Sequence, residues 1–161
     1  MESLMSEQRQ PESGDELLSV MAGGQEFAID IMSVREIRGW VGSTPLPQSP
    51  PFIKGVVNLR GLVLPIVDLP MRLGMEAGEP TATSVVVVVE VEGQVVGLLV
   101  EAVCDIVTVT DEMLQPVPNV GSAASTAAVV GLLTFDDKIV SILNLGQVMP
   151  PRDEQALGAA A

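Results

Sequence analysis

Hydrophobic positions recur along the chain with a period of two, which favours β-strands over helices. Between residues 85 and 91 valine occupies every odd position, while the even positions change from valine to Glu90. This pattern predicts a strand that is buried on one face and partly exposed on the other. Residues 95–103 are apolar at nearly every position except Glu101, and they predict a central strand covered on both faces. The turn at residues 91–94, Val-Glu-Gly-Gln, joins the two strands as a predicted hairpin.

Weaker patterns complete the set of predicted elements. Further strands are predicted at residues 62–68 and 138–144, and short helical turns near residues 69–73, 110–113 and 145–148. Pro65 cannot donate a hydrogen bond to a neighbouring strand, so it predicts that its strand lies at a sheet edge or contains a bulge. Residues 1–16 are polar and acidic and predict a disordered leader, whereas the alanine-rich residues 150–161 predict a flexible tail.

The chain also contains an internal repeat. Residues 24–29 align with 93–98, 34–37 with 103–106, 45–47 with 116–118, and 55–69 with 131–145. Apolar strands resemble one another by chance, but four matches in the same order are stronger evidence than one. The repeat predicts an all-β fold with two pseudo-equivalent lobes, at about residues 17–80 and 81–149. Small barrels are one way to remove exposed strand edges, and a groove between two of them is a natural place to bind a partner.

The two halves differ at one pair of positions, which points to function. Where residue 36 aligns with residue 105, both halves have an acid, Glu36 and Asp105. Where residue 60 aligns with residue 136, the first half has Arg60 and the second has Asp136. Because the fold does not require arginine there, we hypothesise that Glu36 and Arg60 approach each other and orient a binding surface. The alternative is a solvated ion pair that contributes little to stability.

Four other residues leave two interpretations open. Gly55 and Gly61 bracket a predicted strand and are better explained by turn conformations than by the close approach of a partner's backbone. Trp40 is the only tryptophan, and it is either a cap over a barrel or a binding anchor. Cys104 aligns with Arg35 in the repeat, which predicts a position near the surface, and a lone cysteine without histidine is more often inert than catalytic.

Composition excludes several classes of function. The core must be aliphatic, because 47% of the residues are hydrophobic and only 2% are aromatic. The formal net charge of -13, with eight basic residues, argues against nucleic-acid binding and against anionic membranes. Histidine is absent, and the sequence has no nucleophile elbow, zinc spacing, phosphate loop, calcium loop or paired catalytic aspartates, so we expect no enzyme, metal or cofactor. The polar N-terminus and the short apolar runs predict a cytoplasmic protein with no membrane insertion.

Several blocks of the sequence resemble CheW domains, the chemotaxis adaptor family. The blocks are residues 28–37, 44–47, 64–69 and 96–103, and most specifically residues 51–61, Pro-Phe-Ile-Lys-Gly-Val-Val-Asn-Leu-Arg-Gly. The resemblance covers residues 17–149. It implies two five-stranded, SH3-like β-barrel lobes with short helical turns and a hydrophobic core between them. It also implies a scaffold that couples chemoreceptors to the histidine kinase CheA, not an enzyme.

The resemblance further implies partners and site residues. The partners would be the cytoplasmic tip of chemoreceptors and the regulatory domain of CheA, with other CheW-like domains as a further partner in array rings. The residues that match the receptor-binding region of the family are Val34, Glu36, Gly55, Arg60, Gly61, Val103 and Ile106. The kinase-binding residues are not assigned.

Departures from the family pattern leave selectivity open. Glu101 stands where the family usually has aspartate, Cys104 stands where serine is frequent, and residues 121–128 form a loop of small residues. An adaptor of a non-flagellar chemosensory pathway is therefore an alternative. From other classes, a small enzyme or a small-molecule carrier on a double barrel would require converging polar groups or an open cavity.

Overall fold

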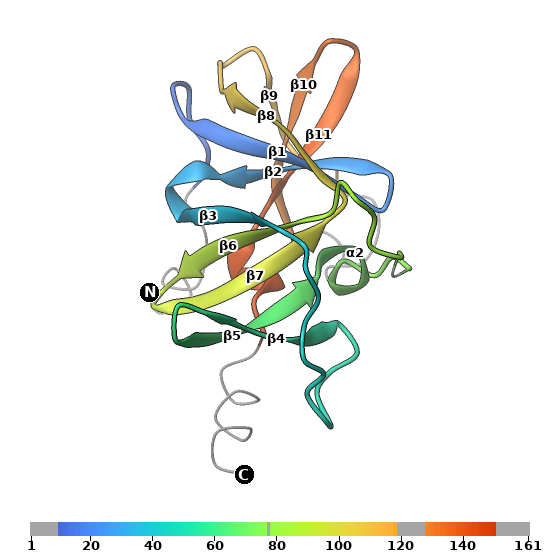
Figure 1. The fold of residues 1–161 in the computed structure, drawn as a ribbon. Helices are drawn as coiled ribbons and strands as arrows, with labels where there is room; N and C mark the ends of the chain where they lie inside the picture. Colours follow the sequence, from blue (N-terminus) through green and yellow to red (C-terminus); the bar gives the residue numbers. More distant parts are fainter. Residues whose placement is uncertain (1–9, 77, 119–127, 151–161) are drawn as a thin grey trace.

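Two antiparallel-rich β-sheets make up most of the molecule (Figure 1). The computed structural model describes residues 10–76, 78–118 and 128–150. The strands are β1 (Glu16–Ala22), β2 (Gln25–Asp30), β3 (Val34–Gly39), β4 (Ile53–Leu59), β5 (Leu62–Asp68), β6 (Val85–Val91), β7 (Gln94–Val100), β8 (Ala102–Thr108), β9 (Leu114–Gln115), β10 (Val129–Phe135) and β11 (Lys138–Leu143). The short helices are η1 (Ile31–Ser33), α2 (Leu69–Arg72) and α4 (Leu145–Val148). The predicted all-β class with short helical turns is confirmed.

The sheets differ in size by one short strand. The order is β8-β1-β2-β11-β10-β9 in the six-stranded sheet and β3-β6-β7-β5-β4 in the five-stranded sheet. The sixth strand, β9, has only two residues, which is why the expectation of five strands in each lobe misses it. Most of the leader predicted for residues 1–16, and nearly all of the tail predicted for 150–161, lie outside the described residues, as does most of the loop at 121–128.

Each sheet contains strands from both halves of the chain. The β1–β2 hairpin pairs with β8 and β11, and its counterpart in the repeat, the β6–β7 hairpin, pairs with β3 and β5. The registers are equivalent, since Ile142 lies opposite Ala28 in one parallel ladder and Ile66 lies opposite Gly97 in the other. A boundary near residue 80 therefore does not separate the two sheets: the two repeats exchange their first hairpins.

The largest hydrophobic cluster lies between the two sheets. It contains Leu18 and Ile29 from the six-stranded sheet, and Val87 and Leu98 from the five-stranded sheet, all at most 2% exposed. Both short α-helices also contribute to it, through Leu69 and Leu145. The sheets therefore form one folded unit, because their joint core excludes water from residues of both repeats.

Each sheet also has an apolar cluster of its own. Leu17, Ala28 and Leu133 form part of the cluster of the six-stranded sheet, and Leu64 and Val86 form part of that of the five-stranded sheet. Side chains alternate between the two faces of a strand. Along one strand, every second residue therefore packs into the cluster between the sheets, and the residues between them pack into the cluster of their own sheet.

This alternation corrects the prediction for residues 85–91. The odd valines Val87 and Val89 enter the cluster between the sheets, but Val86 and Val88 are also buried, on the opposite face. Burying a valine side chain contributes roughly 1.5–3 kcal/mol, so the valine run is explained by a strand with two buried faces. On the face of the even positions, only Glu90, near the end of β6, is partly exposed as predicted.

The strand β5 has the predicted bounds but not the predicted position. It lies inside the sheet, between β7 and β4, and the register shift of the β4–β5 pair falls between Ile53 and Gly55, where Gly55 pairs with Ile66, the residue after Pro65. The parallel ladder with β7 begins only at Ile66, after the proline. The strand is therefore interior overall, but Pro65 lies on a stretch of β5 that has no partner in β7 and one residue from a bulge in the β4–β5 pair, so the prediction holds locally.

The helical turns at residues 69–73 and 145–148 correspond to α2 and α4. The third, at residues 110–113, is a hydrogen-bonded turn instead, in which the Met113 N–H donates to the Thr110 carbonyl oxygen at 3.1 Å. The central position predicted for residues 95–103 is confirmed for β7, the middle strand of its sheet. The strand ends at Val100, and Val103 belongs to β8.

Candidate functional site: an arginine–glutamate cluster at the edge of the five-stranded sheet

Glu36 owes its orientation to a β-bulge in β3. Val34 pairs with Val89 and Glu36 pairs with Val88, so Arg35 is an extra residue between two successive pairs. A bulge of this kind bends the strand and redirects the side chains that follow it. The repeat keeps the irregularity, since Cys104 is the extra residue between Val103 and Asp105 in β8.

Arg60 lies in the tight turn between β4 and β5. Both turn residues have positive φ, 53° at Arg60 and 89° at Gly61, and the Gly61 N–H donates to Asn58 Oδ1 at 2.8 Å. The equivalent turn between β10 and β11 has the same handedness, with φ of 52° at Asp136 and 60° at Asp137. Such turns favour Gly, Asn and Asp, so an arginine at this position is not explained by the turn itself.

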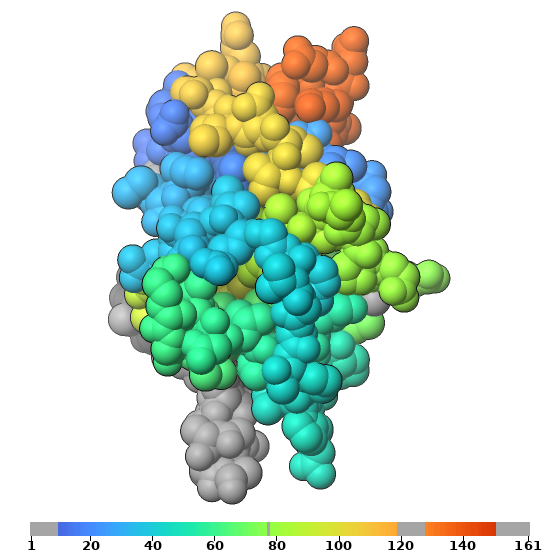
Figure 2. All heavy atoms as spheres, in the orientation of Figure 1, coloured from blue at the N-terminus to red at the C-terminus, as the bar shows by residue number. Residues whose placement is uncertain are grey.

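The structure brings Glu36 and Arg60 together, as hypothesised. Arg60 Nη2 donates a hydrogen bond to Glu36 Oε2, and Arg38 Nη1 lies 3.4 Å from Glu36 Oε1. Figure 2 shows the light-blue residues of β3 beside the green residues of the β4–β5 turn on the near face of the molecule. The Glu36 side chain is 28% exposed and that of Arg60 is 69% exposed, so the pair is accessible to a partner.

The two arginines change the acidity of the carboxylate. The hydrogen bond from Arg60 lowers the pKa of Glu36 below its ordinary value of 4.5, against an opposing effect of partial desolvation, and Arg38 lowers it further. The same hydrogen bond raises the pKa of Arg60. At neutral pH the three groups are therefore charged, and together they carry an excess of one positive charge.

The remaining predicted site residues divide into two groups. Gly55 is buried with φ of 149°, and a Cβ there would lie 2.5 Å from the Thr44 carbonyl oxygen and 2.6 Å from Ser43 Oγ. Thr44 forms a bridge with Val56, so Gly55 lets the segment after β3 cross close to β4. Gly61 has open space around it and serves the turn. Both glycines thus have a structural explanation, but only Gly61 has the turn conformation that the sequence favoured, because Gly55 lies within β4.

The apolar candidates lie on both sheets. Val34 on β3 and Val103 on β8 are partly buried, and both pack against the cluster between the sheets. Ile106 on β8 is 51% exposed. β3 and β8 are edge strands of different sheets. The seven candidates are thus distributed over the edge strand β3, the edge strand β8, and β4 with its turn to β5, and the contact between Glu36 and Arg60 is the polar interaction that the structure shows among them.

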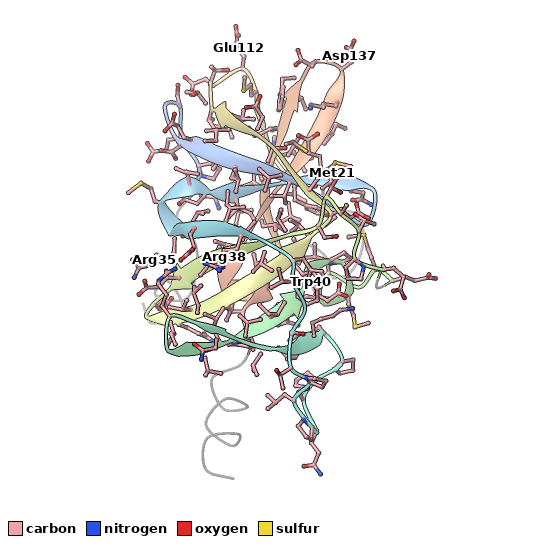
Figure 3. All side chains as sticks on the ribbon, viewed as in Figure 1. Met21, Arg35, Arg38, Trp40, Glu112 and Asp137 are labelled. Atoms are coloured by element: carbon pink, nitrogen blue, oxygen red, sulfur yellow. The ribbon has the colours of Figure 1, made fainter. Side chains whose placement is uncertain are left out.

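Arg38, which lies beside the pair, was missed as a site residue, and Trp40 was left open between a cap and a binding anchor. Arg38 lies two positions beyond Glu36 on the same strand, a spacing that places both side chains on one face and could have identified it. Trp40 is partly buried against the apolar cluster of the five-stranded sheet, which favours the cap over the free anchor. Figure 3 shows Arg35 and Arg38 together on β3, with Trp40 beyond the end of the strand.

The cluster has the chemistry of recognition. Its groups are two guanidinium ions and a carboxylate, which bind by ion pairing and directional hydrogen bonds. Within the part of the chain that the structure describes, no group of three His, Cys, Asp or Glu side chains could hold a metal ion. Cys104 is exposed, as predicted. No helix among the described residues is long and apolar enough to cross a membrane.

Two interlocked β-sheets with an exposed ion-pair cluster favour the class of protein-binding domains. Comparison with known proteins specifies the family: residues 16–151 match the CheW-like domain model. The chain belongs to this family.

Individual relatives agree over most of the chain. The chemotaxis protein CheW of Rhizobium meliloti is 46% identical over 143 residues, which cover 89% of this chain and 92% of that protein. The CheW of Klebsiella aerogenes is 33% identical, with 89% of this chain and 86% of that protein covered. The crystal structure of the scaffolding protein TtCheW from Thermoanaerobacter tengcongensis superposes with a TM-score of 0.78 at 30% identity, over 86% of this chain and 94% of that one. These similarities support the role of a chemotaxis adaptor.

Proposed function

We propose that the chain couples the cytoplasmic tip of chemoreceptors to the regulatory domain of the kinase CheA, and that it does so in the cytoplasm without catalysing a reaction. The observation that carries the proposal is the Arg60–Glu36 pair, held at an exposed sheet edge in a fold shared with a scaffolding protein. The counterpart of Arg60 in the repeat is Asp136. A pair found in only one of two equivalent sheets is better explained by partner recognition than by the needs of the fold.

The receptor-binding surface would include the edge of β3, the β4–β5 turn and the edge of β8. Its residues would be Val34, Glu36, Gly55, Arg60, Gly61, Val103 and Ile106. The apolar residues would supply most of the affinity, while the ion-pair cluster would fix the register of the partner. Gly55 and Gly61 would act indirectly, by shaping the backbone beneath the surface.

The proposed mechanism is geometric. An adaptor that binds receptor and kinase at separate surfaces raises their effective concentration towards each other. A change in the receptor then alters kinase activity by favouring one conformation of the kinase. The joint core between the sheets supports this role, because it makes the two sheets one body through which the positions of both partners are related.

The decisive experiment is a titration of the full chain against a chemoreceptor tip fragment and, separately, against the CheA regulatory domain. Arg60→Glu should weaken receptor binding by about tenfold or more, because it places two carboxylates together. Asp136→Arg is the matched control, since it changes the charge by two units, in the opposite direction, at the equivalent turn of the other sheet. The double variant Glu36→Arg/Arg60→Glu, which reverses the pair, should recover part of the lost affinity.

Three outcomes distinguish a role of the pair in partner recognition from a role in the fold, and test the adaptor function itself. Loss of receptor binding by a folded Arg60→Glu variant, with Asp136→Arg close to wild type, supports the site. If Arg60→Glu does not fold, the hypothesis that the pair serves partner recognition is contradicted, because the fold itself would then require Arg60. If neither partner binds the wild-type chain, the adaptor role for these partners fails.

A further inference from the structure

The chain passes twice between the two sheets on its way from β1 to β11. β2 leads into β3 through η1, and β7 leads into β8 through the single residue Glu101. Figure 1 shows the first passage on the left of the molecule and the second on the right. Glu101 is held from both sides, because its N–H donates to the Met21 carbonyl oxygen at 2.8 Å and its own carbonyl oxygen accepts from Thr83 Oγ1 at 3.0 Å. Every other link between the described parts of the two sheets is non-covalent.

One such link is made by residues 148–150 at the end of α4, which we call the strap. The strap follows the last strand of the six-stranded sheet, and its three residues are buried. Arg72 on α2 donates to the carbonyl oxygens of its first two residues at 3.2 and 3.3 Å, and Gln94 Nε2, at the start of β7, donates to that of Pro150 at 2.9 Å. Side chains from β7 and from the helix that follows β5 therefore hold three successive carbonyl groups of a segment that comes from the other sheet.

The repeat shows that the burial of Gln94 serves the strap and not the hairpin. Gln94 aligns with Gln25, and each residue begins the second strand of an equivalent hairpin. Gln25 is exposed, whereas Gln94 is only 9% exposed. A buried amide needs a hydrogen-bond partner, and the Pro150 carbonyl oxygen is that partner. Since the hairpin itself does not require a buried glutamine, the burial of Gln94 is explained by the strap.

The first half of the chain makes a link of a different kind. The segment after α2 reaches the β1–β2 turn of the six-stranded sheet, where a Cβ on Gly23 would lie 2.7 Å from Met75 Sδ. The backbone N–H groups of Gly74 and Met75 donate to Met71 and Pro70, within their own half of the chain. This link is therefore an apolar contact, and the strap adds directional hydrogen bonds to it.

Directional bonds matter because the core between the sheets is apolar. The hydrophobic effect has no preferred direction, and packed layers slide past one another in shear motions. Hydrogen bonds, in contrast, weaken steeply when the donor is no longer in line with its acceptor. Three hydrogen bonds from two elements, α2 and β7, consequently oppose a displacement of the sheets that the core alone would tolerate.

We propose that the strap fixes the position of one sheet relative to the other, with Arg72 and Gln94 as its positioning residues, and that the adaptor needs this fixed position to pass the state of the receptor to the kinase. The inference rests on the proposed function, because the receptor-binding surface proposed above takes Glu36 from one sheet and Ile106 from the other. With the strap released, both partners would still bind, but a movement imposed on one sheet would no longer be carried to the other.

A distance measurement between the sheets tests the first part. Cys104, the only cysteine, is exposed on β8, and Val63 on β5 is 62% exposed, so nitroxide labels at Cys104 and at Val63→Cys report the two sheets by pulsed EPR. Gln94→Glu keeps the shape of the side chain but places an acceptor opposite the Pro150 carbonyl oxygen, and it should broaden the distance distribution about twofold or more. Gln25→Glu is the matched control, since it makes the same change at the equivalent exposed position, and it should leave the distribution unchanged.

Two further variants separate the strap from general stability. Arg72→Met removes the other two hydrogen bonds and should also broaden the distribution, so the test does not depend on the folding of one variant. Ile142→Val weakens the apolar cluster of the six-stranded sheet without touching the strap. It should leave the distance distribution as in the wild type.

The second part is tested in complexes of a chemoreceptor, CheA and the full chain, by following kinase autophosphorylation with and without the receptor. Gln94→Glu should bind each partner within about threefold of the wild type, because the strap lies outside the proposed binding surface. It should lower the receptor-dependent kinase activity about fivefold or more. Gln25→Glu and Ile142→Val should match the wild type in both measurements.

The outcomes separate this inference from the proposed function. If Gln94→Glu gives the wild-type distance distribution, the strap does not fix the sheets and the inference is wrong. It is also wrong if the distribution broadens while the receptor still controls the kinase, if Ile142→Val loses control to the same extent, or if a folded Gln94→Glu no longer binds a partner. If neither partner binds the wild-type chain, the proposed function fails and the coupling role fails with it, whereas the distance measurement still decides whether the strap fixes the sheets.

Discussion

Ile66 of β5 and Gly97 of β7 face each other across a parallel ladder so closely that a Cβ at position 97 would lie 2.7 Å from Ile66 Cδ1. The same Cβ would lie 2.5 Å from Val86 Cγ1. Gly97→Ala should therefore destabilise the protein by about 1–3 kcal/mol, as expected for an overpacked core. Urea unfolding followed by circular dichroism measures the change.

Gly131 is the control for this prediction. It also lies in a strand, but a Cβ there would meet nothing closer than 3.7 Å. Gly131→Ala should be neutral or slightly stabilising, because alanine reduces the freedom of the unfolded chain. Equal destabilisation by both substitutions would show that strand glycines matter for another reason than the contact with Ile66.

The repeat could be recognised in the sequence, but the pairing of its strands could not be predicted from it. The alignment of residues 55–69 with 131–145 places β4, β5 and α2 over β10, β11 and α4, and even the positive φ of Arg60 recurs at Asp136. Yet the hydrophobic pattern of a hairpin is the same whether it pairs with strands of its own repeat or of the other. Periodicity identifies the buried face of a strand, not its neighbour.

The exchange of hairpins predicts how fragments of the chain behave. Residues 1–80 contain β1 and β2 of one sheet with β3, β4 and β5 of the other, so neither sheet is complete in this fragment. The fragments 1–80 and 81–161 should each be unfolded alone and should regain β structure when mixed in equal amounts. Circular dichroism and size-exclusion chromatography of each fragment and of the mixture measure this. A cooperatively folded monomer of either fragment would contradict the prediction.

Part of the candidate site could also be predicted from the repeat. Comparing the two halves singled out Glu36 and Arg60, because their counterparts Asp105 and Asp136 cannot form an ion pair. The same comparison could have added Arg38, whose counterpart is Val107. The small cavity lined by Trp40, Asn58 and Val86 could not be foreseen, since it depends on how the segment after β3, β4 and β6 are arranged in space.

The pKa of Glu36 predicts how the cluster responds to acid. Because Arg60 and Arg38 lower this pKa below 4.5, the folded carboxylate holds its charge to lower pH than the unfolded one. The stabilisation is therefore complete above the unfolded pKa and is lost as pH falls through the folded pKa. An NMR titration of the Glu36 side-chain carboxyl carbon should give a midpoint below 4.5, and Arg60→Gln should raise it. A midpoint that does not move in Arg60→Gln would show that the pair does not form in solution.

Arg72 links the two repeats at the end of α4. Its guanidinium donates to the carbonyl oxygens of Val148 and Met149 at 3.2 and 3.3 Å, and it stacks 4.4 Å from the centroid of the Phe52 ring. Arg72→Met keeps the length of the side chain but removes both hydrogen bonds and the cation–π contact. Since hydrogen bonds from charged groups contribute about 1.5–3 kcal/mol and these two are long, we expect the free energy of unfolding, measured in urea, to fall by about 1–2 kcal/mol.

The matched variant Arg35→Met, which removes an exposed ion pair with Glu90, should change stability little. If the two variants were equally stable, the hydrogen bonds of Arg72 would contribute no more than a surface ion pair, and the end of α4 would be held by its apolar contacts alone.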